Sequence, residues 1–282
     1  MKTYHRIIFG NSANMPELAD ESIQLIVTSP PYFNAPFDYQ DLFPSYEAYL
    51  DLIMSFAREA MRVLEAGRVV AVNTDDMLVN GKRYPIVADT TKIFIDAGFD
   101  YRDRITWKKP EGYIRISRRS GVLLQHPWPL YYYPDNIQES ILIFQKGKPD
   151  YKSLRAKRDK DDPIEKEEYL GGKWYLNLWE MTNRLPNQTN GWKPSDYPAA
   201  FPDELAYRLI RLFSYRGETI LDPFLGSGTT SRVAAMLGRN SVGYEILRNL
   251  KGLIEQRIRD ADPHAEVEFW DRAREGVKKP AQ

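Results

Sequence analysis

Two short motifs contain the residues of this sequence that are best placed to do chemistry. The first is the run Thr28-Ser29-Pro30-Pro31-Tyr32-Phe33. It offers two hydrogen-bond acceptors, the Ser29 hydroxyl and the Pro30 carbonyl, and proline's fixed φ keeps such a carbonyl well aimed. By accepting hydrogen bonds from the N–H groups of a ring-bound amine, these two acceptors can draw its nitrogen toward tetrahedral geometry. The face of Tyr32 can stack on the ring at the same time. Because no histidine neighbours Ser29, we do not expect a serine nucleophile.

The second motif lies far downstream and has the character of a ligand-binding loop. It is the run Asp222-Pro223-Phe224-Leu225-Gly226-Ser227-Gly228-Thr229-Thr230. Gly226 and Gly228 let the backbone pass close to a ligand, and the N-terminus of the next helix points at it. The lysine of a phosphate loop and the third glycine of the dinucleotide pattern are both absent. Glu245, about twenty residues after the glycines, suits the hydroxyls of a ribose. A purely structural turn is the alternative. The positions of Asp222, Phe224 and Glu245 relative to the glycines favour a ligand site instead.

Each motif follows an apolar run that is typical of a buried strand, 25–27 for the first and 219–221 for the second. Ligands bind at the carboxyl ends of strands in open parallel sheets, so both motifs are expected there. Ser45 indicates a helix N-cap and Gly67 the end of that helix. Strand alternating with helix predicts an α/β fold with a mostly parallel sheet and helices on both faces. The other predicted strands are 7–9, 69–72, 104–107, 140–144 and 241–243, and the predicted helices are 45–67, 84–97 and one from 202 onward.

Composition narrows the function. The chain of 282 residues has no cysteine, three histidines and a formal net charge of zero. Without cysteine there is no disulfide, no thiolate metal site and no cysteine nucleophile. The three histidines are scattered, so no metal is expected. No apolar run is long enough to cross a membrane and no signal peptide is evident, so we expect a cytoplasmic protein.

Together the motifs resemble those of the nucleic-acid amino-methyltransferases, which transfer a methyl group from S-adenosylmethionine (AdoMet) to an exocyclic base amine. The order, catalytic motif first, resembles the permuted beta class of DNA methyltransferases, over roughly residues 4–145 and 192–255. The resemblance implies a Rossmann-like AdoMet-dependent fold with an inserted irregular region. The expected parts are a catalytic half in 1–146, a target-recognition region in 147–198, an AdoMet-binding half in 199–262 and a frayed surface tail in 263–282.

By the same resemblance AdoMet is the cofactor. The loop from Phe224 to Gly228 and Asp222 would contact its methionine part, Glu245 its ribose, and the segment 197–202 its other side. The family usually has Gly-Asp after its early strand, whereas this chain has Gly10-Asn11. A cofactor contact from Asn11 would therefore lack the negative charge of the family's aspartate. The predicted cofactor-binding residues are Asn11, Thr28, Phe201, Asp222, Pro223, Phe224, Gly226, Ser227, Gly228, Thr229 and Glu245.

The resemblance makes Ser29, Pro30, Pro31 and Tyr32 the catalytic residues. In the family, Ser at the first of these positions commonly accompanies the cytosine amine, and Asp or Asn adenine. We therefore predict N4 of a flipped-out cytosine as the target, with adenine N6 and an RNA substrate as open alternatives. Methyltransferases of protein glutamine or small-molecule amines usually place the cofactor motif first. A DNA-binding module without activity would not need both motifs intact.

Double-stranded DNA is the expected partner, with a cognate restriction endonuclease as functional partner and a homodimer as a further expectation from the resemblance. The stretch 101–119 is strongly basic, which favours phosphate contact over a merely solvated loop. The region 147–198 lies where the family carries its recognition region. The aromatic segment 126–133 fits a base pocket, a subunit interface or the edge of a packed core. The predicted DNA-binding residues are Lys108, Lys109, Arg115, Arg118 and Arg119.

Overall fold

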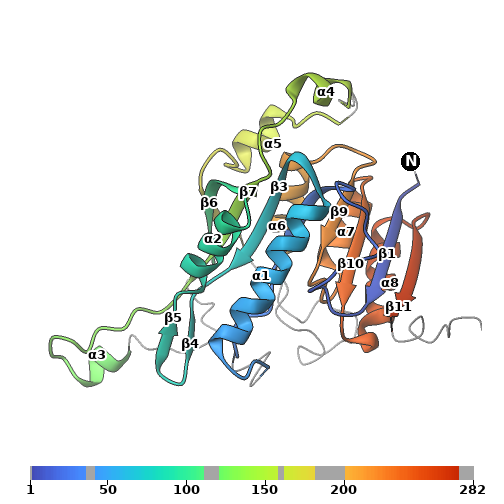
Figure 1. The fold of residues 1–282 in the computed structure, drawn as a ribbon. Helices are drawn as coiled ribbons and strands as arrows, with labels where there is room; N and C mark the ends of the chain where they lie inside the picture. The colour runs from blue at the N-terminus through green and yellow to red at the C-terminus, as the bar shows by residue number, and fades with distance from the viewer. Residues whose placement is uncertain (1, 36–41, 111–120, 158–161, 182–200, 273–282) are drawn as a thin grey trace, which may run out of the picture.

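The computed structural model describes residues 2–35, 42–110, 121–157, 162–181 and 201–272. Helices and strands alternate along most of this length (Figure 1). In chain order the elements are β1 (Tyr4–Phe9), β2 (Ile23–Thr28), α1 (Tyr46–Val63), β3 (Leu64–Thr74), β4 (Met77–Val79), β5 (Lys82–Tyr84), α2 (Ile86–Asp96), β6 (Asp100–Lys108), α3 (Gly121–Gln125), β7 (Gln138–Gln145), α4 (Tyr151–Ala156), α5 (Lys166–Gly171), β8 (Leu178–Glu180), α6 (Asp203–Phe213), β9 (Thr219–Asp222), α7 (Thr229–Met236), β10 (Asn240–Glu245), the 3-10 helix η3 (Arg248–Leu250), α8 (Lys251–Ala261) and β11 (Glu266–Asp271).

One large sheet organises the described residues. Its strand order is β11-β1-β10-β9-β2-β3-β7-β6-β8, and a two-stranded hairpin of β4 and β5 stands apart from it. Neighbouring strands are parallel except at β7, which is antiparallel to both β3 and β6. From β2 the order runs outward through β3, and from β9 it runs the other way through β10. The carboxyl ends of β2 and β9 therefore meet at the topological switch point, where α/β sheets bind ligands.

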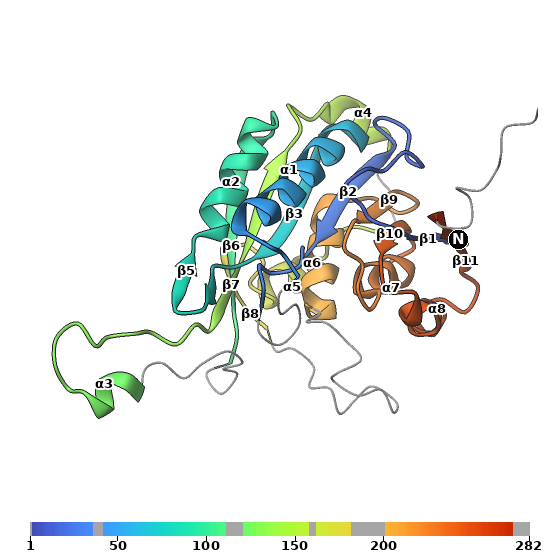
Figure 2. The ribbon, with the colours of Figure 1, turned by 60° about the horizontal axis from the view of Figure 1, so that its bottom comes forward.

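Helices cover both faces of the sheet, as the sequence predicts. Helices α1 and α2 lie on one face and α6 and α7 on the other (Figure 2). The apolar run of β2 explains how both layers are held: Ile26 belongs to the core cluster under α1, whereas Leu25 and Val27 belong to the cluster under α6 and α7. Since side chains alternate along a strand, a run without polar residues buries both faces at once.

Helix α1 begins where the sequence indicates but ends earlier. The Ser45 hydroxyl accepts a hydrogen bond from the Ala48 amide at 3.2 Å, which confirms the N-cap. The helix stops at Val63, and the Leu64 amide closes its last turn, so the prediction of an end at Gly67 is wrong. Gly67 lies within β3 at φ +79, where a Cβ would come to 2.5 Å from the Pro149 Cα. A glycine is needed at position 67 for this close approach, not to end a helix.

The last strand corrects a second expectation. Residues 266–271 form β11, which pairs in parallel with β1 at the edge of the sheet. Val267 and Phe269 pack against a third core cluster, and the Phe269 ring stacks on Phe9 with 6.0 Å between centroids. The prediction of a frayed tail after residue 262 is therefore wrong for this segment. The alternation of charged and apolar residues in 266–269 was the available signal.

The inserted region is more regular than the sequence indicated, because its described residues contain α4, α5 and β8. Strand β8 extends the sheet beyond β6. A buried carboxylate ties the region to the rest of the fold: Asp162 forms ion pairs with Arg211 and with Arg239, the latter at 2.7 Å. Arg239 is almost fully buried, so its charge depends on this partner.

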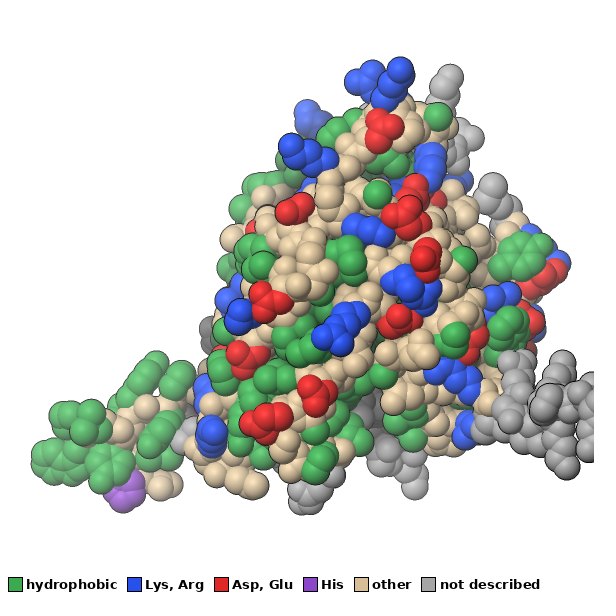
Figure 3. Space-filling model, viewed as in Figure 1, with side chains coloured by type: hydrophobic (Ala, Val, Ile, Leu, Met, Phe, Trp, Pro, Cys, Tyr) green, Lys and Arg blue, Asp and Glu red, His purple; other side chains and the backbone are tan. Residues whose placement is uncertain are grey.

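The segment around α3 projects away from the sheet (Figures 1 and 2) and shows apolar side chains on its surface (Figure 3). Trp128 is 68% exposed, Leu130 94% and Tyr132 70%. The interpretation of 126–133 as the edge of a packed core is therefore wrong. No helix among the described residues combines the length and apolarity that a membrane crossing requires.

We expect Asp162→Asn to lower the free energy of unfolding by about 3 kcal/mol, because it leaves buried guanidinium charge without its partner. Urea unfolding followed by circular dichroism measures the change. The matched control is Asp96→Asn, which removes the carboxylate of the exposed Lys92–Asp96 pair and should change stability little. Equal unfolding midpoints for Asp162→Asn and the wild type would contradict the anchoring role.

Candidate functional site

One buried carboxylate joins the two motifs. The Thr28 hydroxyl donates a hydrogen bond of 2.6 Å to Asp222 Oδ1, across 194 positions of the sequence. The Thr230 hydroxyl donates to Asp222 Oδ2 at 2.6 Å, and the Phe224 amide to Oδ1 at 3.1 Å. The end of β2, the end of β9 and the first turn of α7 are therefore held on one side chain. Ser29 therefore directly follows a residue that is bonded to Asp222, and Asp222 leads into the glycine loop.

Asp222 itself is 1% exposed. Burial raises the pKa of its carboxyl to about 6, and the hydrogen bonds from Thr230, Thr28 and the Phe224 amide oppose that rise. Both carboxyl oxygens are engaged within the protein, so the described contacts give Asp222 a positioning role. Its predicted contact with the cofactor stays a prediction.

The glycine loop borders open space. Gly226 has φ +56, and a Cβ placed on it would meet no atom within 4 Å. Gly228 has φ +85 and caps α7, with Ile254 Cγ2 at 3.2 Å from the position of a Cβ. The hydroxyl of Thr229, on the first turn of α7, is buried and has no hydrogen-bond partner among the described residues. The loop thus offers both room and a free polar atom beside a helix N-terminus.

Glu245 ends β10 beside this loop. Its carboxylate accepts hydrogen bonds of 2.8 Å from the Gly226 amide and from the Leu247 amide, one on each oxygen. Burial raises the pKa of the Glu245 carboxyl, and these backbone amides oppose the rise. Each carboxylate oxygen retains acceptor capacity after one hydrogen bond. The carboxylate is therefore held in place while still able to accept from a hydroxyl.

The loop after β1 approaches the same edge, and its anchor was not foreseen from the sequence. The Gly10 amide donates to the Glu245 carbonyl at 2.9 Å, and the Asn11 side chain accepts from the Ala13 amide at 2.8 Å. Arg272, just after β11, donates to the Asn14 carbonyl at 2.5 Å and pairs with Glu17 at 2.6 Å. The C-terminal strand thereby restrains the loop that contains Asn11.

The catalytic motif is held by residues of two further strands, β3 and β7, and by Lys109, which directly follows β6. The Tyr32 hydroxyl donates to Glu139 Oε2 at 2.7 Å, and the Asn73 amide donates to the same oxygen at 2.6 Å. Lys109 forms an ion pair with Glu139. The Asn73 amide nitrogen also lies 3.5 Å from Ser29 Oγ. Burial, and then the carboxylate of Glu139, raise the pKa of the Tyr32 phenol far above its usual value, so the phenol stays a donor.

Sequence reasoning missed Asn73 and Glu139. Asn73 lies near the carboxyl end of β3, one strand from β2, and its position after an apolar run was a usable signal. Glu139 lies near the start of β7, and only the reversed direction of that strand brings its beginning to this edge. Nothing in the residue pattern of a single strand reveals its direction.

The other predicted residues divide into four groups. Pro30, Pro223, Ser227 and Phe201 are buried, and Ser227 accepts a hydrogen bond of 2.6 Å from Arg257. Pro31 and Phe224 are half-buried, and Phe224 packs on the core of α1. Lys108 pairs with Glu180 at 2.9 Å. Arg115, Arg118 and Arg119 lie outside the described residues, as do positions 197–200.

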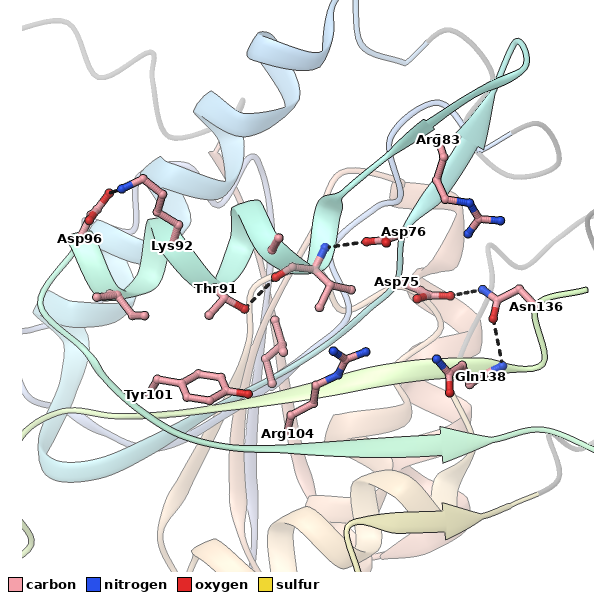
Figure 4. A pocket seen from close by; sticks show the side chains of 14 residues that line it. Asp75, Asp76, Arg83, Thr91, Lys92, Asp96, Tyr101, Arg104, Asn136 and Gln138 are labelled. Carbon is pink, nitrogen blue, oxygen red and sulfur yellow. Dashed lines mark hydrogen bonds and ion pairs between the residues drawn. The ribbon is translucent and has the colours of Figure 1, made fainter. Parts of the chain in front are cut away.

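A polar groove adjoins the catalytic motif, between α2 and the strands β6 and β7 (Figure 4). Its volume is about 640 Å³. Asp75 receives a hydrogen bond from Asn136 at one end, and Arg104 and Gln138 lie along the floor. Burial raises the pKa of the Asp75 carboxyl to about 6. Asp75 follows Asn73 by two positions and Gln138 precedes Glu139, so the groove continues from the catalytic edge.

Residues 23–256 match the profile of the N6/N4 DNA methylase family. The chain belongs to this family. The methylase is 35% identical to the Type II methyltransferase M.MthZI of Methanothermobacter thermautotrophicus, over 92% of this chain and 78% of that protein. It is 34% identical to M.MjaI of Methanocaldococcus jannaschii, over 91% of each.

Solved structures agree with the fold of the methylase. TTHA0409 of Thermus thermophilus, described as a DNA modification methylase and solved with S-adenosyl-L-methionine, has a TM-score of 0.70 and 28% identity, over 95% of this chain and 100% of that one. The cytosine-N4-specific PvuII DNA methyltransferase has a TM-score of 0.61 at 19% identity, over 95% of this chain and 96% of that one, which shows the shared fold.

The methylase is an AdoMet-dependent DNA methyltransferase. The residues at the switch point fit this cofactor. The open space at Gly226, the free Thr229 hydroxyl and the fixed Glu245 carboxylate suit an amino acid and a ribose. AdoMet has no phosphate, so the glycine loop does not require the lysine of a phosphate loop.

Asp222→Asn should change how stability depends on pH. The folded chain holds the Asp222 proton to about pH 6, and the unfolded chain releases it near pH 3.8. As the pH rises through that window, the wild type therefore loses stability relative to the variant, by about 3 kcal/mol in all. Urea unfolding of both proteins from pH 4 to pH 7 measures the difference, and a difference independent of pH would contradict the assignment.

Proposed function

We propose that this methylase transfers a methyl group to N4 of cytosine at a specific DNA sequence. The observation that carries the proposal is the Thr28–Asp222 hydrogen bond at the switch point. It supports placing the Ser29 hydroxyl beside the loop where the cofactor binds. The Ser-Pro-Pro-Tyr motif supports the choice of cytosine by its resemblance to N4-cytosine enzymes of the permuted beta class.

In this proposal Thr229, Ser227 and the loop from Pro223 to Gly228 hold the methionine part of the cofactor. Glu245 holds the ribose, and Asn11, Thr28 and Phe201 border the same space. Asp222 acts by fixing the loop. When bound, AdoMet supplies an electrophilic methyl group.

The catalytic motif then acts on the base. Ser29 Oγ and the Pro30 carbonyl accept hydrogen bonds from the N–H groups of the amine, which draws the nitrogen lone pair out of conjugation with the ring. Pro31 holds the turn, and Tyr32 stacks on the flipped-out base. The chemistry depends on positioning, because no covalent bond to the protein is needed.

Target recognition is proposed for the inserted region 147–198, of which α4, α5 and β8 are described. Lys108, Arg115, Arg118 and Arg119 are proposed phosphate contacts. Lys109 would have to leave its ion pair with Glu139 to join them. Because relatives of the chain are Type II methyltransferases, we propose a restriction endonuclease of the same specificity as functional partner. A homodimer is proposed from the family resemblance alone.

Incubation of mixed-sequence DNA with the methylase and AdoMet should yield N4-methylcytosine, because Ser29 stands at the first catalytic position. Mass spectrometry of the digested nucleosides measures the product. N6-methyladenine would contradict the choice of base. The absence of any methylated nucleoside despite bound AdoMet would contradict DNA as substrate, and the same assay on RNA would then locate the acceptor.

Ser29→Ala should abolish methyl transfer and leave AdoMet affinity near normal, because the hydroxyl faces the amine rather than the cofactor. Tritium transfer measures the first effect and calorimetric titration the second. Ser55→Ala is the matched control, since Ser55 bonds only the Asp51 carbonyl within α1. Normal turnover by Ser29→Ala would remove this hydroxyl from the mechanism.

A further inference from the structure

Glu139 lies outside both motifs, yet its carboxylate contacts side chains from three separate segments of the chain. One of its oxygens accepts from Tyr32 and from Asn73, at 2.7 and 2.6 Å, and the other pairs with Lys109. The side chains of Glu139 and Lys109 are only 12% and 15% exposed. Water therefore screens this pair weakly, and each contact is more strongly directional than at the surface.

The carboxylate determines how Asn73 is oriented. An ionised carboxylate only accepts hydrogen bonds, so the Asn73 amide must turn its NH₂ group toward Glu139. Its carbonyl oxygen, Oδ1, is then directed elsewhere, and it is buried without a hydrogen-bond partner among the described residues. Asn73 is 2% exposed and its amide nitrogen lies 3.5 Å from Ser29 Oγ. The Asn73 amide nitrogen, and not its unsatisfied oxygen, is therefore the atom that lies toward Ser29 Oγ.

The same carboxylate restrains the ring of Tyr32. The phenol donates to Glu139, which limits rotation of the ring about its side-chain bonds. Phe33 does not share this role, because it is 4% exposed and packs edge-to-face on Tyr46 and Tyr84 in the core. The stacking face is thus held from two sides, by the backbone of the motif and by β7.

Glu139 also closes the base of the connection between β6 and β7. Lys109 follows β6 directly, and its amide donates to the Ile137 carbonyl at 2.7 Å. The connection between these two residues includes the projecting segment around α3 (Figure 2). The two ends of this connection are therefore held together by the Lys109–Ile137 hydrogen bond. Lys109 is held in turn by the carboxylate that binds Tyr32.

We propose that Glu139 is a positioning residue for methyl transfer: it orients the Tyr32 ring and the Asn73 amide against the target base. This inference rests on the proposed roles of Ser29 and Tyr32. Glu139 reaches the base only through these two side chains, so it is not itself a catalytic residue.

Glu139→Gln tests the proposal at nearly constant volume. Tyr32 and Asn73 share one oxygen of Glu139 and Lys109 takes the other, so a glutamine that keeps its oxygen toward Tyr32 and Asn73 must turn its NH₂ group toward the Lys109 ammonium. Two donors then face each other, and the glutamine must give up either the Lys109 contact or the Tyr32 and Asn73 contacts. We expect kcat for methyl transfer, measured well below the melting transition, to fall about tenfold with the AdoMet Kd unchanged. The melting temperature should also fall, because the weakly exposed Lys109 loses its carboxylate. A kcat equal to that of the wild type in the folded variant would overturn the proposal.

A double-mutant cycle with Tyr32→Phe identifies the path. If Glu139 acts through the phenol, Glu139→Gln should lower kcat much less in the Tyr32→Phe background than in the wild type. If the factor by which Glu139→Gln lowers kcat is the same in the Tyr32→Phe background as in the wild type, the coupling to Tyr32 is overturned. Glu21→Gln is the matched control, because Glu21 pairs with Lys146 at 2.9 Å just beyond the opposite end of β7.

A readout without methyl transfer separates this proposal from the proposed function. The protein is labelled with 3-fluorotyrosine, and the Tyr32 resonance is assigned by its loss in Tyr32→Phe. In Glu139→Gln this resonance should shift and titrate at lower pH than in the wild type, because the neighbouring negative charge is gone. An unchanged Tyr32 resonance overturns the positioning role. A changed resonance in a protein that methylates no nucleic acid supports the coupling and counts against the proposed function alone.

Discussion

The rest of the structure depends on one buried carboxylate. Asp222 accepts from Thr28, from Thr230 and from the Phe224 amide, so two strands and a helix that are distant in sequence meet at one point. Burial of a carboxyl is unfavourable unless hydrogen bonds compensate, and here both oxygens have donors. The switch point of a parallel sheet becomes a defined site through this arrangement, with the glycine loop on one side and Ser29 on the other.

A second carboxylate completes the site from the other half of the sheet. Glu139 collects Tyr32 from the loop after β2, Asn73 from β3 and Lys109 from the end of β6. The two carboxylates differ in partners: Asp222 is satisfied by neutral donors, whereas Glu139 has a cation. Both act by holding other side chains still, which fits a reaction that needs alignment more than covalent chemistry.

The elements that differ from expectation share a physical cause. Gly67 indicated a helix end, but its positive φ serves the passage of Pro149 across β3. The segment at 266–271 was predicted to be part of a tail, yet the open edge of β1 pairs with it. The inserted region gains order from Asp162, which is held by Arg211 on α6 and by Arg239 just before β10. In each case a partner remote in sequence decided the local structure.

The sequence by itself determined the strand ends that carry both motifs and the alternation of strand and helix. Those depend on local spacing, turn residues and apolar runs, which a linear pattern records. Only the tertiary structure decided which strands are neighbours and that β7 runs against the others. The direction of β7 brings the beginning of that strand to the carboxyl edge. Glu139 and Asn73 therefore belong to the site through sheet pairing, which no single segment encodes.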